Sequence, residues 1–135
     1  MDELIAAFLA AVSFNAGERP DYARIRELFI ERGVLISQRG EITDVDEFIA
    51  PRQATVDSGA LTEFEETELE SITEEFGNVA HRFSGYAKRG VLNGEPFSTR
   101  GVISTQFVRT EQGWRMSAMA WDDEREGLTV PERLR

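Results

Sequence analysis

Residues typical of tight turns divide the second half of the chain into long segments. This pattern strongly predicts an antiparallel meander. Gly77-Asn78, Asn93-Gly94 and Glu111-Gln112-Gly113 are typical of the tight turns that close β-hairpins. The segments between these turns are candidate strands. From Leu61 onward we therefore expect strands at Phe64–Glu75, Val79–Lys88, Phe97–Arg109 and Trp114–Asp122.

The first third of the chain instead follows helical periodicity. One helix face is marked by apolar residues at the i, i+3, i+4, i+7 spacing, and Gly17 ends that helix. Three helices followed by a meander predict an α+β domain in which the helices cover one face of a curved sheet. The expected elements are a helix with Ile5, Phe8, Leu9 and Val12, a helix from Pro20 to Gly33, a short strand at Val34–Ile36, and a helix from the capping box of Asp44 and Glu47 to Gly59, kinked or restarted at Pro51.

The length of 135 residues fits one domain. We place the domain at residues 1–124 and a C-terminal tail at 125–135. The last dozen residues lack periodicity and contain Gly127 and Pro131. We expect this tail to be loose and dispensable for stability.

The charge balance limits the expected partners. With 25 acidic and 15 basic residues the net charge is −10, and phosphate binding needs a basic face, so we expect no nucleic acid. No run approaches the ~18 apolar residues of a membrane span. The opening Met1-Asp2-Glu3 lacks the basic start of an export signal. We therefore expect an acidic cytoplasmic protein without a membrane partner.

Residue usage limits the chemistry as well. The absence of cysteine excludes thiolate nucleophiles and zinc–cysteine sites, and a single histidine, His81, excludes a multi-histidine metal centre. The only lysine, Lys88, stands beside Arg89-Gly90 in an expected turn, which is a poor place for a desolvated Schiff-base amine. We expect neither a metal nor another cofactor.

Polar residues among apolar neighbours on the strands indicate a candidate pocket. Alternate side chains of a strand share a face, and no strand here has one wholly polar face, so both faces of the sheet should be partly covered. Taken singly, these polar residues fit a sheet surface or an internal hydrogen-bonded network. Taken together with aromatic neighbours, they suit a mostly apolar pocket with a few converging polar groups. The ligand-binding candidates are Phe64, Glu66, Ser84, Arg100, Ser104, Gln106, Trp114 and Trp121.

The most acidic stretch, from Glu63 to Glu75, holds seven glutamates and no basic residue. Such a run is commonly a solvated strand that resists edge-to-edge aggregation. The sharper hypothesis is that Glu66 or Glu68 points inward beneath the helices. Desolvation would then raise the pKa of that carboxyl and make it a usable general acid or base.

Three residues are candidates for catalysis: Glu68, Tyr86 and His81. A lone histidine on a strand is more often a packed or surface residue than a catalyst. If His81 did act, it would need a carboxylate within hydrogen-bond reach, and Glu68 or Glu70 on the neighbouring strand is the natural candidate.

Five segments together resemble a known family. They are Phe64–Glu68, Phe76–His81, Phe83–Tyr86, Arg100–Phe107 and Gly113–Trp121, following three helices. In this order they resemble the SnoaL-like branch of the nuclear transport factor 2-like superfamily, and the likeness covers roughly residues 3 to 124.

The resemblance implies a cone-shaped, cystatin-like α+β barrel, in which a curved antiparallel (mixed) sheet wraps around three N-terminal helices and encloses a pocket. It also implies a homodimer formed through the sheet. The family contains isomerases, dehydratases, cyclases, epoxide hydrolases and non-catalytic modules, so the fold does not decide the function. In members similar to the steroid isomerases a carboxylate base and a hydroxyl donor face the cone, and Glu66 or Glu68 with Tyr86 would take those places here.

Two functions follow as expectations. The first is a pocket for a small hydrophobic molecule, used by a cofactor-independent acid–base enzyme of isomerase, dehydratase or cyclase type on a hydrophobic carbonyl or polyketide-like compound. Glu68 or Glu66 would move the proton, Tyr86 and Ser104 would stabilise charge on the carbonyl oxygen, and Arg100 with Gln106 would orient polar groups. The alternative is a non-catalytic dimeric binding or scaffold module with a vestigial pocket.

Overall fold

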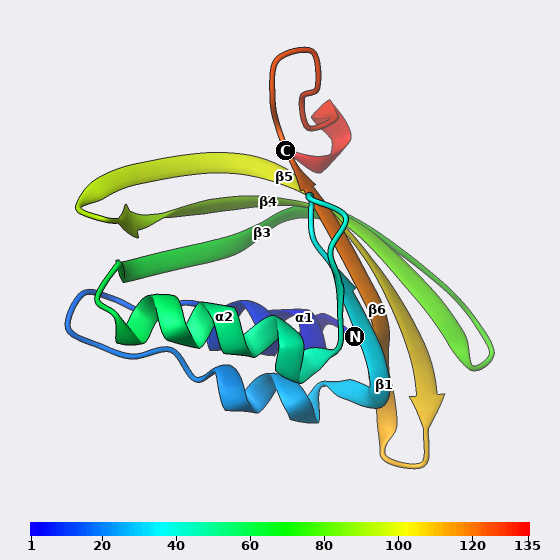
Figure 1. Ribbon diagram of the computed structural model, residues 1–135. Helices are drawn as coiled ribbons and strands as arrows, with labels where there is room; N and C mark the ends of the chain where they lie inside the picture. The colour runs from blue at the N-terminus through cyan, green and yellow to red at the C-terminus, as the bar shows by residue number, and fades with distance from the viewer.

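The computed structural model of the protein describes all residues from Met1 to Arg135 and contains one six-stranded mixed sheet (Figure 1). Two α-helices and a 3₁₀ helix come from the first half of the chain, and a second 3₁₀ helix ends it. The elements are α1 (Asp2–Val12), η1 (Tyr22–Glu27), β1 (Phe29–Ile36), β2 (Ile42–Thr43), α2 (Val45–Asp57), β3 (Leu61–Phe76), β4 (Val79–Leu92), β5 (Glu95–Thr110), β6 (Gly113–Asp123) and η2 (Glu132–Leu134).

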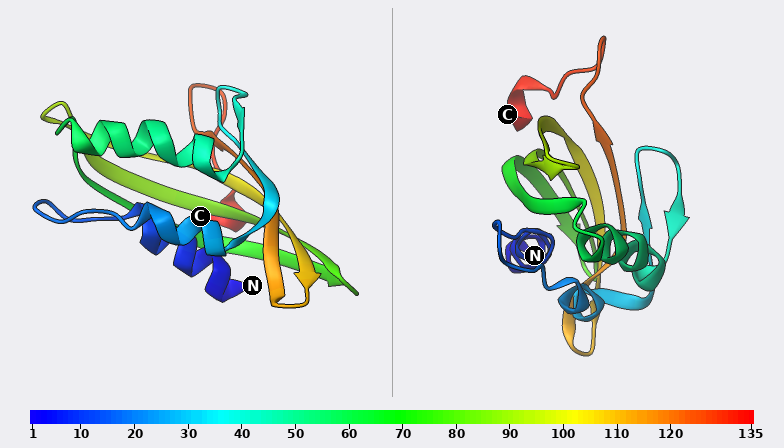
Figure 2. Two further views of the ribbon diagram at one scale, coloured as in Figure 1. Left: turned by 60° about the horizontal axis from the view of Figure 1, so that its bottom comes forward. Right: turned by 60° about the vertical axis from the view of Figure 1, so that its left-hand side comes forward.

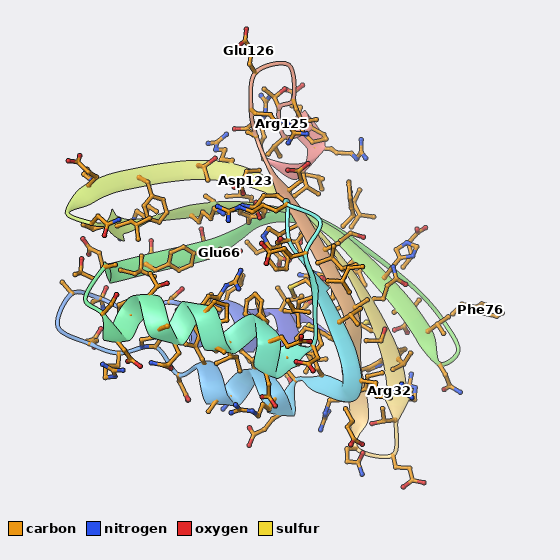
Figure 3. The ribbon with its side chains drawn as sticks, in the orientation of Figure 1. Arg32, Glu66, Phe76, Asp123, Arg125 and Glu126 are labelled. Carbon is orange, nitrogen blue, oxygen red and sulfur yellow. The ribbon has the colours of Figure 1, made fainter.

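The sheet has the strand order β2-β1-β6-β5-β4-β3. All neighbouring strands are antiparallel except β1 and β6, which are parallel. The predicted hairpins are present. Asn93 and Gly94 both have positive φ, as a tight two-residue hairpin turn requires, and Phe76 at the β3–β4 tip points away from the helices (Figure 3).

The sheet curves over the helices, so that α1, η1 and α2 lie against its concave face (Figure 1). Figure 2 shows the same helices from below and from the side, with η2 on the opposite side of the sheet. The predicted α+β class, with a curved sheet around N-terminal helices, is confirmed. No helix in the chain is both long enough and apolar enough to cross a membrane.

One predicted helix is largely a strand. The helix expected from Pro20 to Gly33 is limited to η1, and the chain becomes strand β1 at Phe29. Ile30, Val34 and Ile36 are β-branched and favour a strand, and pairing of β1 with β6 overrides the apolar spacing that indicated a helix. The capping box of Asp44 and Glu47 does begin α2, which continues through Pro51.

Bulges decide which strand residues face the helices. Strand β3 gains one extra residue between Glu68 and Ser71 relative to β4, and β6 gains one at Ser117 relative to β5. Beyond each bulge the inward-facing set changes parity. On β4 the even-numbered residues from Ala80 to Lys88 face the helices, while on β5 the odd-numbered residues from Gly101 to Phe107 do so.

The C-terminal segment is folded rather than loose. Val130 is 2% exposed and Leu134 is fully buried. The carbonyl of Leu134 lies so close to Gly85 that a side chain at that position would overlap it. The expectation of a loose tail is therefore wrong, because this segment packs against part of the outer face of the sheet, beside Gly85.

Candidate functional site

A cavity of about 160 Å³ lies between the helices and the concave face of the sheet. α1 is tied to β3 beside it, because Phe14 and Phe64 exchange both backbone hydrogen bonds and the Glu66 amide donates to Ser13 Oγ at 3.1 Å. This attachment sets Glu66 beneath the end of α1. The apolar wall consists of Phe8, Val12, Phe48, Leu61, Phe64, Ile103, Met119 and Trp121, and the polar lining residues are Tyr22, Arg52, Glu66, Tyr86 and Lys88.

Two of these polar residues, Tyr86 and Lys88, are already bound to Asp123. The Tyr86 hydroxyl donates to Oδ1 of Asp123, and Lys88 Nζ forms an ion pair with the same oxygen at 3.0 Å. The other Asp123 oxygen lies 3.4 Å from Nε2 of Gln38. Burial, followed by the hydrogen bond to Asp123, raises the pKa of Tyr86, so its phenol stays protonated. These groups satisfy one another and form a fixed edge of the site.

Glu66 has no such partner. Its carboxyl faces the cavity and receives no hydrogen bond from another side chain. Its pKa is raised to about 7, chiefly by burial; the charges of Lys88 and Arg52 oppose this rise and the charge of Asp123 adds to it. Glu66 therefore changes protonation state near neutral pH in an apolar enclosure. Figure 3 labels Glu66 on β3 and Asp123 at the end of β6.

Arg52 brings a second unsatisfied group to the cavity. It lies on the face of α2 that carries Phe48, one turn earlier, and its guanidinium carbon lies 3.7 Å from the Phe48 ring centroid and 5.9 Å from that of Trp121. Its one hydrogen bond runs from NH1 to the Phe48 carbonyl, 3.0 Å away, and it forms no ion pair. Burial lowers the pKa of Arg52, and the charges of nearby acidic groups offset part of this effect.

Tyr22, at the start of η1, is the third unsatisfied group. Its ring is buried and lines the cavity, and its hydroxyl has no hydrogen bond to another side chain. Burial raises the pKa of Tyr22, and the charge of Arg52, which lines the same cavity, opposes that rise. The phenol therefore remains a hydrogen-bond donor beside the guanidinium.

Solved structures with the same arrangement of elements identify the fold. A nuclear transport factor 2-like superfamily protein of Salmonella enterica superposes over 96% of this chain and 92% of its own, with a TM-score of 0.76 and 18% sequence identity. The chain has the nuclear transport factor 2-like fold. A hexachlorocyclohexane dehydrochlorinase of Novosphingobium barchaimii matches 96% of this chain and 91% of its own, with a TM-score of 0.75 and 12% identity. A protein of Caulobacter vibrioides with a cystatin-like fold matches 92% and 87%, with a TM-score of 0.72 and 15% identity.

The sequence comparisons add nothing to this fold assignment. No protein-family model matches the chain, and no curated protein matches it. At such low identities the likeness to solved structures establishes the nuclear transport factor 2-like fold alone. The chemistry of the site has to be argued from its own residues.

The nuclear transport factor 2-like fold brings four of the sequence candidates to the cavity. Phe64 and Glu66 reach it from β3, Tyr86 from β4 and Trp121 from β6. Of the two glutamates proposed as the proton-transferring group, Glu66 faces the cavity and Glu68 does not.

Glu68 lies on the same concave face but beside a different partner. Its two carboxylate oxygens accept from Nε and NH2 of Arg82, at 2.9 and 2.6 Å. NH1 of Arg82 also donates to Asp2 at 2.6 Å and to Thr73 at 3.0 Å. Glu68 therefore joins β3 to β4 and to the start of α1. Ser84 is buried between this cluster and Tyr86 on β4 without lining the cavity.

The remaining candidates lie away from the cavity. Residues Arg100, Ser104 and Gln106 are on the outer face of β5, because Ile103 and Thr105 take the inward positions. His81 is exposed on the outer face of β4, with Nε2 2.8 Å from Oε1 of Glu74. Trp114 stands near the β5–β6 turn, where the guanidinium of Arg109 lies 4.5 Å from its ring centroid. The expectation that these residues share a pocket with Tyr86 is wrong.

Sequence reasoning missed Tyr22, Arg52, Lys88 and Asp123. Lys88 is not in a turn: β4 continues to Leu92, and Lys88 follows Ser84 and Tyr86 on the inward face. Its parity with Tyr86 is a signal that could have placed it. Likewise Asp123 shares its parity with Trp121, and Arg52 follows Phe48 at helical spacing.

Proposed function

We propose that the cavity binds a small, largely apolar molecule and that Glu66 transfers a proton to or from it in a cofactor-independent acid–base reaction. The observation that carries the proposal is the Glu66 carboxyl, which faces an apolar enclosure without a hydrogen bond from another side chain. A group that titrates near pH 7 is suited to both proton transfers of such a reaction. Glu68 is held by Arg82 and takes no part.

The size of the cavity limits the ligand. A volume of about 160 Å³ is close to that of an engineered protein cavity that takes up one benzene molecule. This supports a ligand with one ring, or a branched chain of similar size. A cavity of this volume favours a monocyclic carbonyl compound over a polyketide with several fused rings.

The polar groups have separate parts in this chemistry. As a carboxylate, Glu66 takes a proton from the carbon next to a carbonyl, and the electron pair of the broken C–H bond forms the enolate. Arg52 and Tyr22 supply donors for the oxygen that gains charge. The protonated Glu66 then returns the proton to the same carbon or to a conjugated one. Tyr86 is a positioning residue, because its proton is held by Asp123.

Hydrogen exchange on a monocyclic ketone tests the proposal. We expect the protein to accelerate exchange of the α-protons of cyclohexanone in D₂O, followed by NMR. In the Glu66→Gln variant the accelerated exchange rate should fall by about a hundredfold or more. Glu70→Gln, which changes an exposed glutamate of the same strand, is the matched control. Equal exchange rates in the Glu66→Gln variant and the native protein would exclude Glu66 as the base.

A non-catalytic binding module is the second candidate. It is favoured by the Tyr86 hydroxyl, which donates to Asp123 and so is not free to stabilise charge on a ligand. The same experiment separates the two functions. Cyclohexanone that shifts the NMR signals of cavity residues without faster exchange would support binding alone.

We also propose that the protein forms a homodimer through the outer face of the sheet. Ile72 and Phe83 are paired across β3 and β4 and are 43% and 38% exposed. Such an apolar pair on an open sheet face suits a protein contact. Light scattering should give the mass of two chains, and Phe83→Glu should reduce it to that of one. A native protein that remains a single chain at micromolar concentration contradicts this proposal.

A further inference from the structure

We infer that the ligand of this cavity carries a carboxylate, and that Arg52 and Tyr22 bind it. The inference rests on the proposed function and narrows it: the carbonyl group that Arg52 and Tyr22 face becomes the carboxylate of the ligand, and the carbon from which Glu66 takes a proton is the one next to that carboxylate. It specifies a small carboxylic acid with one ring or a branched chain, with its acid group at the α2–η1 side and its apolar part against Phe64, Ile103 and Met119.

The first argument is the pairing of charges in the cavity. Lys88 is matched by Asp123, with 3.0 Å between Nζ and Oδ1. Arg52 has no carboxylate within ion-pair distance; the acidic groups whose charges act on it are Glu41, which is exposed, and Glu66 in the cavity. When Glu66 is protonated, Arg52 is a half-buried cation with no counter-charge inside the cavity. Buried charges are normally paired, so an anionic ligand supplies what the protein does not.

The second argument is the orientation of the guanidinium. Its flat face stacks on Phe48 and lies near Trp121, and one edge donates to the Phe48 carbonyl. Stacking uses the face of the group and leaves the other N–H donors in its plane. A guanidinium edge matches the two oxygens of a carboxylate, a geometry that a neutral carbonyl uses only in part.

The third argument is the position of Tyr22. Tyr22 is a buried residue whose hydroxyl has no side-chain partner, and both Tyr22 and Arg52 line the cavity. Tyr22 and Arg52 come from η1 and α2, which pack against each other on the same side of the cavity. Two adjacent elements thus present a neutral donor and a charged group of donors of which only NH1 of Arg52 has an acceptor. A carboxylate oxygen accepts from both.

Benzoate and benzamide, which differ in charge but hardly in size, are the probes for this inference. Calorimetric titration at pH 7 and constant ionic strength measures both dissociation constants. We expect benzoate to bind about tenfold or more tightly than benzamide, because a hydrogen bond to a charged group is stronger than a neutral one. Arg52→Gln should abolish this preference, because it should weaken benzoate binding far more than benzamide binding.

Three further variants separate recognition from a structural role of Arg52. Arg52→Lys keeps the charge and should retain part of the preference for benzoate. Tyr22→Phe should weaken benzoate more than benzamide. Arg24→Gln, which removes an exposed arginine of η1, is the matched control and should change neither constant. Thermal unfolding of each variant confirms that the domain remains folded.

Each outcome bears on the inference. If benzamide binds as tightly as benzoate, or if the preference survives in Arg52→Gln, the inference is overturned while the cavity remains a ligand site. If neither compound binds to the native protein at millimolar concentration, the inference is overturned, and the exchange experiment with cyclohexanone decides separately whether the proposed function stands. A preference for benzoate that is lost in Arg52→Gln and partly kept in Arg52→Lys supports the inference.

Discussion

The hydroxyl of Tyr86 donates a hydrogen bond to Oδ1 of Asp123, 37 positions further along the chain. Gly101 stands between them in the register of β4, β5 and β6. The phenol reaches Asp123 only because residue 101 has no side chain: a Cβ there would overlap the Tyr86 hydroxyl and the Asp122 carbonyl. The glycine on β5 thus lets side chains of β4 and β6, the strands on either side of it, interact directly.

Tyr86→Phe should lower the free energy of unfolding by about 1–3 kcal/mol, because it leaves Asp123 without one of its donors in a half-buried place. Chemical denaturation in urea measures the change. Gly101→Ala should also destabilise the domain, by about 1–3 kcal/mol, because its methyl group displaces the phenol. The two effects should be non-additive in the double variant. If the two effects simply add, the substitutions do not act on the same Tyr86–Asp123 contact.

Glu66 makes stability depend on pH in a predictable direction. Its pKa rises from 4.5 in the unfolded chain to about 7 in the fold, so between these values the folded state holds a proton that the unfolded state has lost. Stability is therefore greatest below pH 4.5 as far as this group is concerned, falls as the pH rises to 7, and is then constant.

Glu66→Gln should remove this dependence. Above pH 7 the variant should be more stable than the native protein by on the order of 3 kcal/mol, because the native carboxylate is ionised in an apolar cavity. Near pH 4.5 the two should be almost equal. Urea denaturation across this pH range measures the difference, with Glu70→Gln as an exposed control. A constant difference at every pH would contradict the raised pKa of Glu66.

The sequence was sufficient for most of the fold. The pair Asn93-Gly94 favours the positive φ angles of a tight hairpin turn. The capping box of Asp44 and Glu47 favours the start of a helix through local hydrogen bonds alone. The segment from Pro20 to Gly33 was mispredicted because its strand exists through pairing with β6, which is distant in sequence. Local spacing contains no information about that partner.

The site was predicted only in part, and strand parity explains why. The correct face was chosen on β4, where Tyr86 faces inward, and the wrong face on β5, where Ser104 and Gln106 face outward. A bulge after Glu68 also separates the inward residues of β3 into two groups with different neighbours. Because a single extra residue exchanges the two faces, polar side chains on neighbouring strands cannot be matched until the register is known.

Glu68 provides a prediction that distinguishes it from Glu66. Glu68→Gln should destabilise the protein by about 1–3 kcal/mol, because Arg82 is buried and loses its paired acceptor. It should leave benzoate binding unchanged, since its carboxylate does not line the cavity. Urea denaturation and calorimetric titration measure the two properties. A loss of binding at unchanged stability would place Glu68 in the ligand site after all.

The C-terminal segment should be required for stability. Leu134→Ala should cost about 2 kcal/mol or more, because its side chain is fully buried against the outer face of the sheet. Gly85→Ala should cost a similar amount by pushing the Leu134 carbonyl away.

In a protein that ends at residue 129, Gly85→Ala should have almost no further effect, because the group that its methyl would overlap is absent. Urea denaturation of the single and combined variants measures this coupling, and Leu128→Ala, an exposed leucine of the same segment, is the control. Equal effects of Gly85→Ala in the full-length and shortened proteins would show that the clash is not with the C-terminal segment.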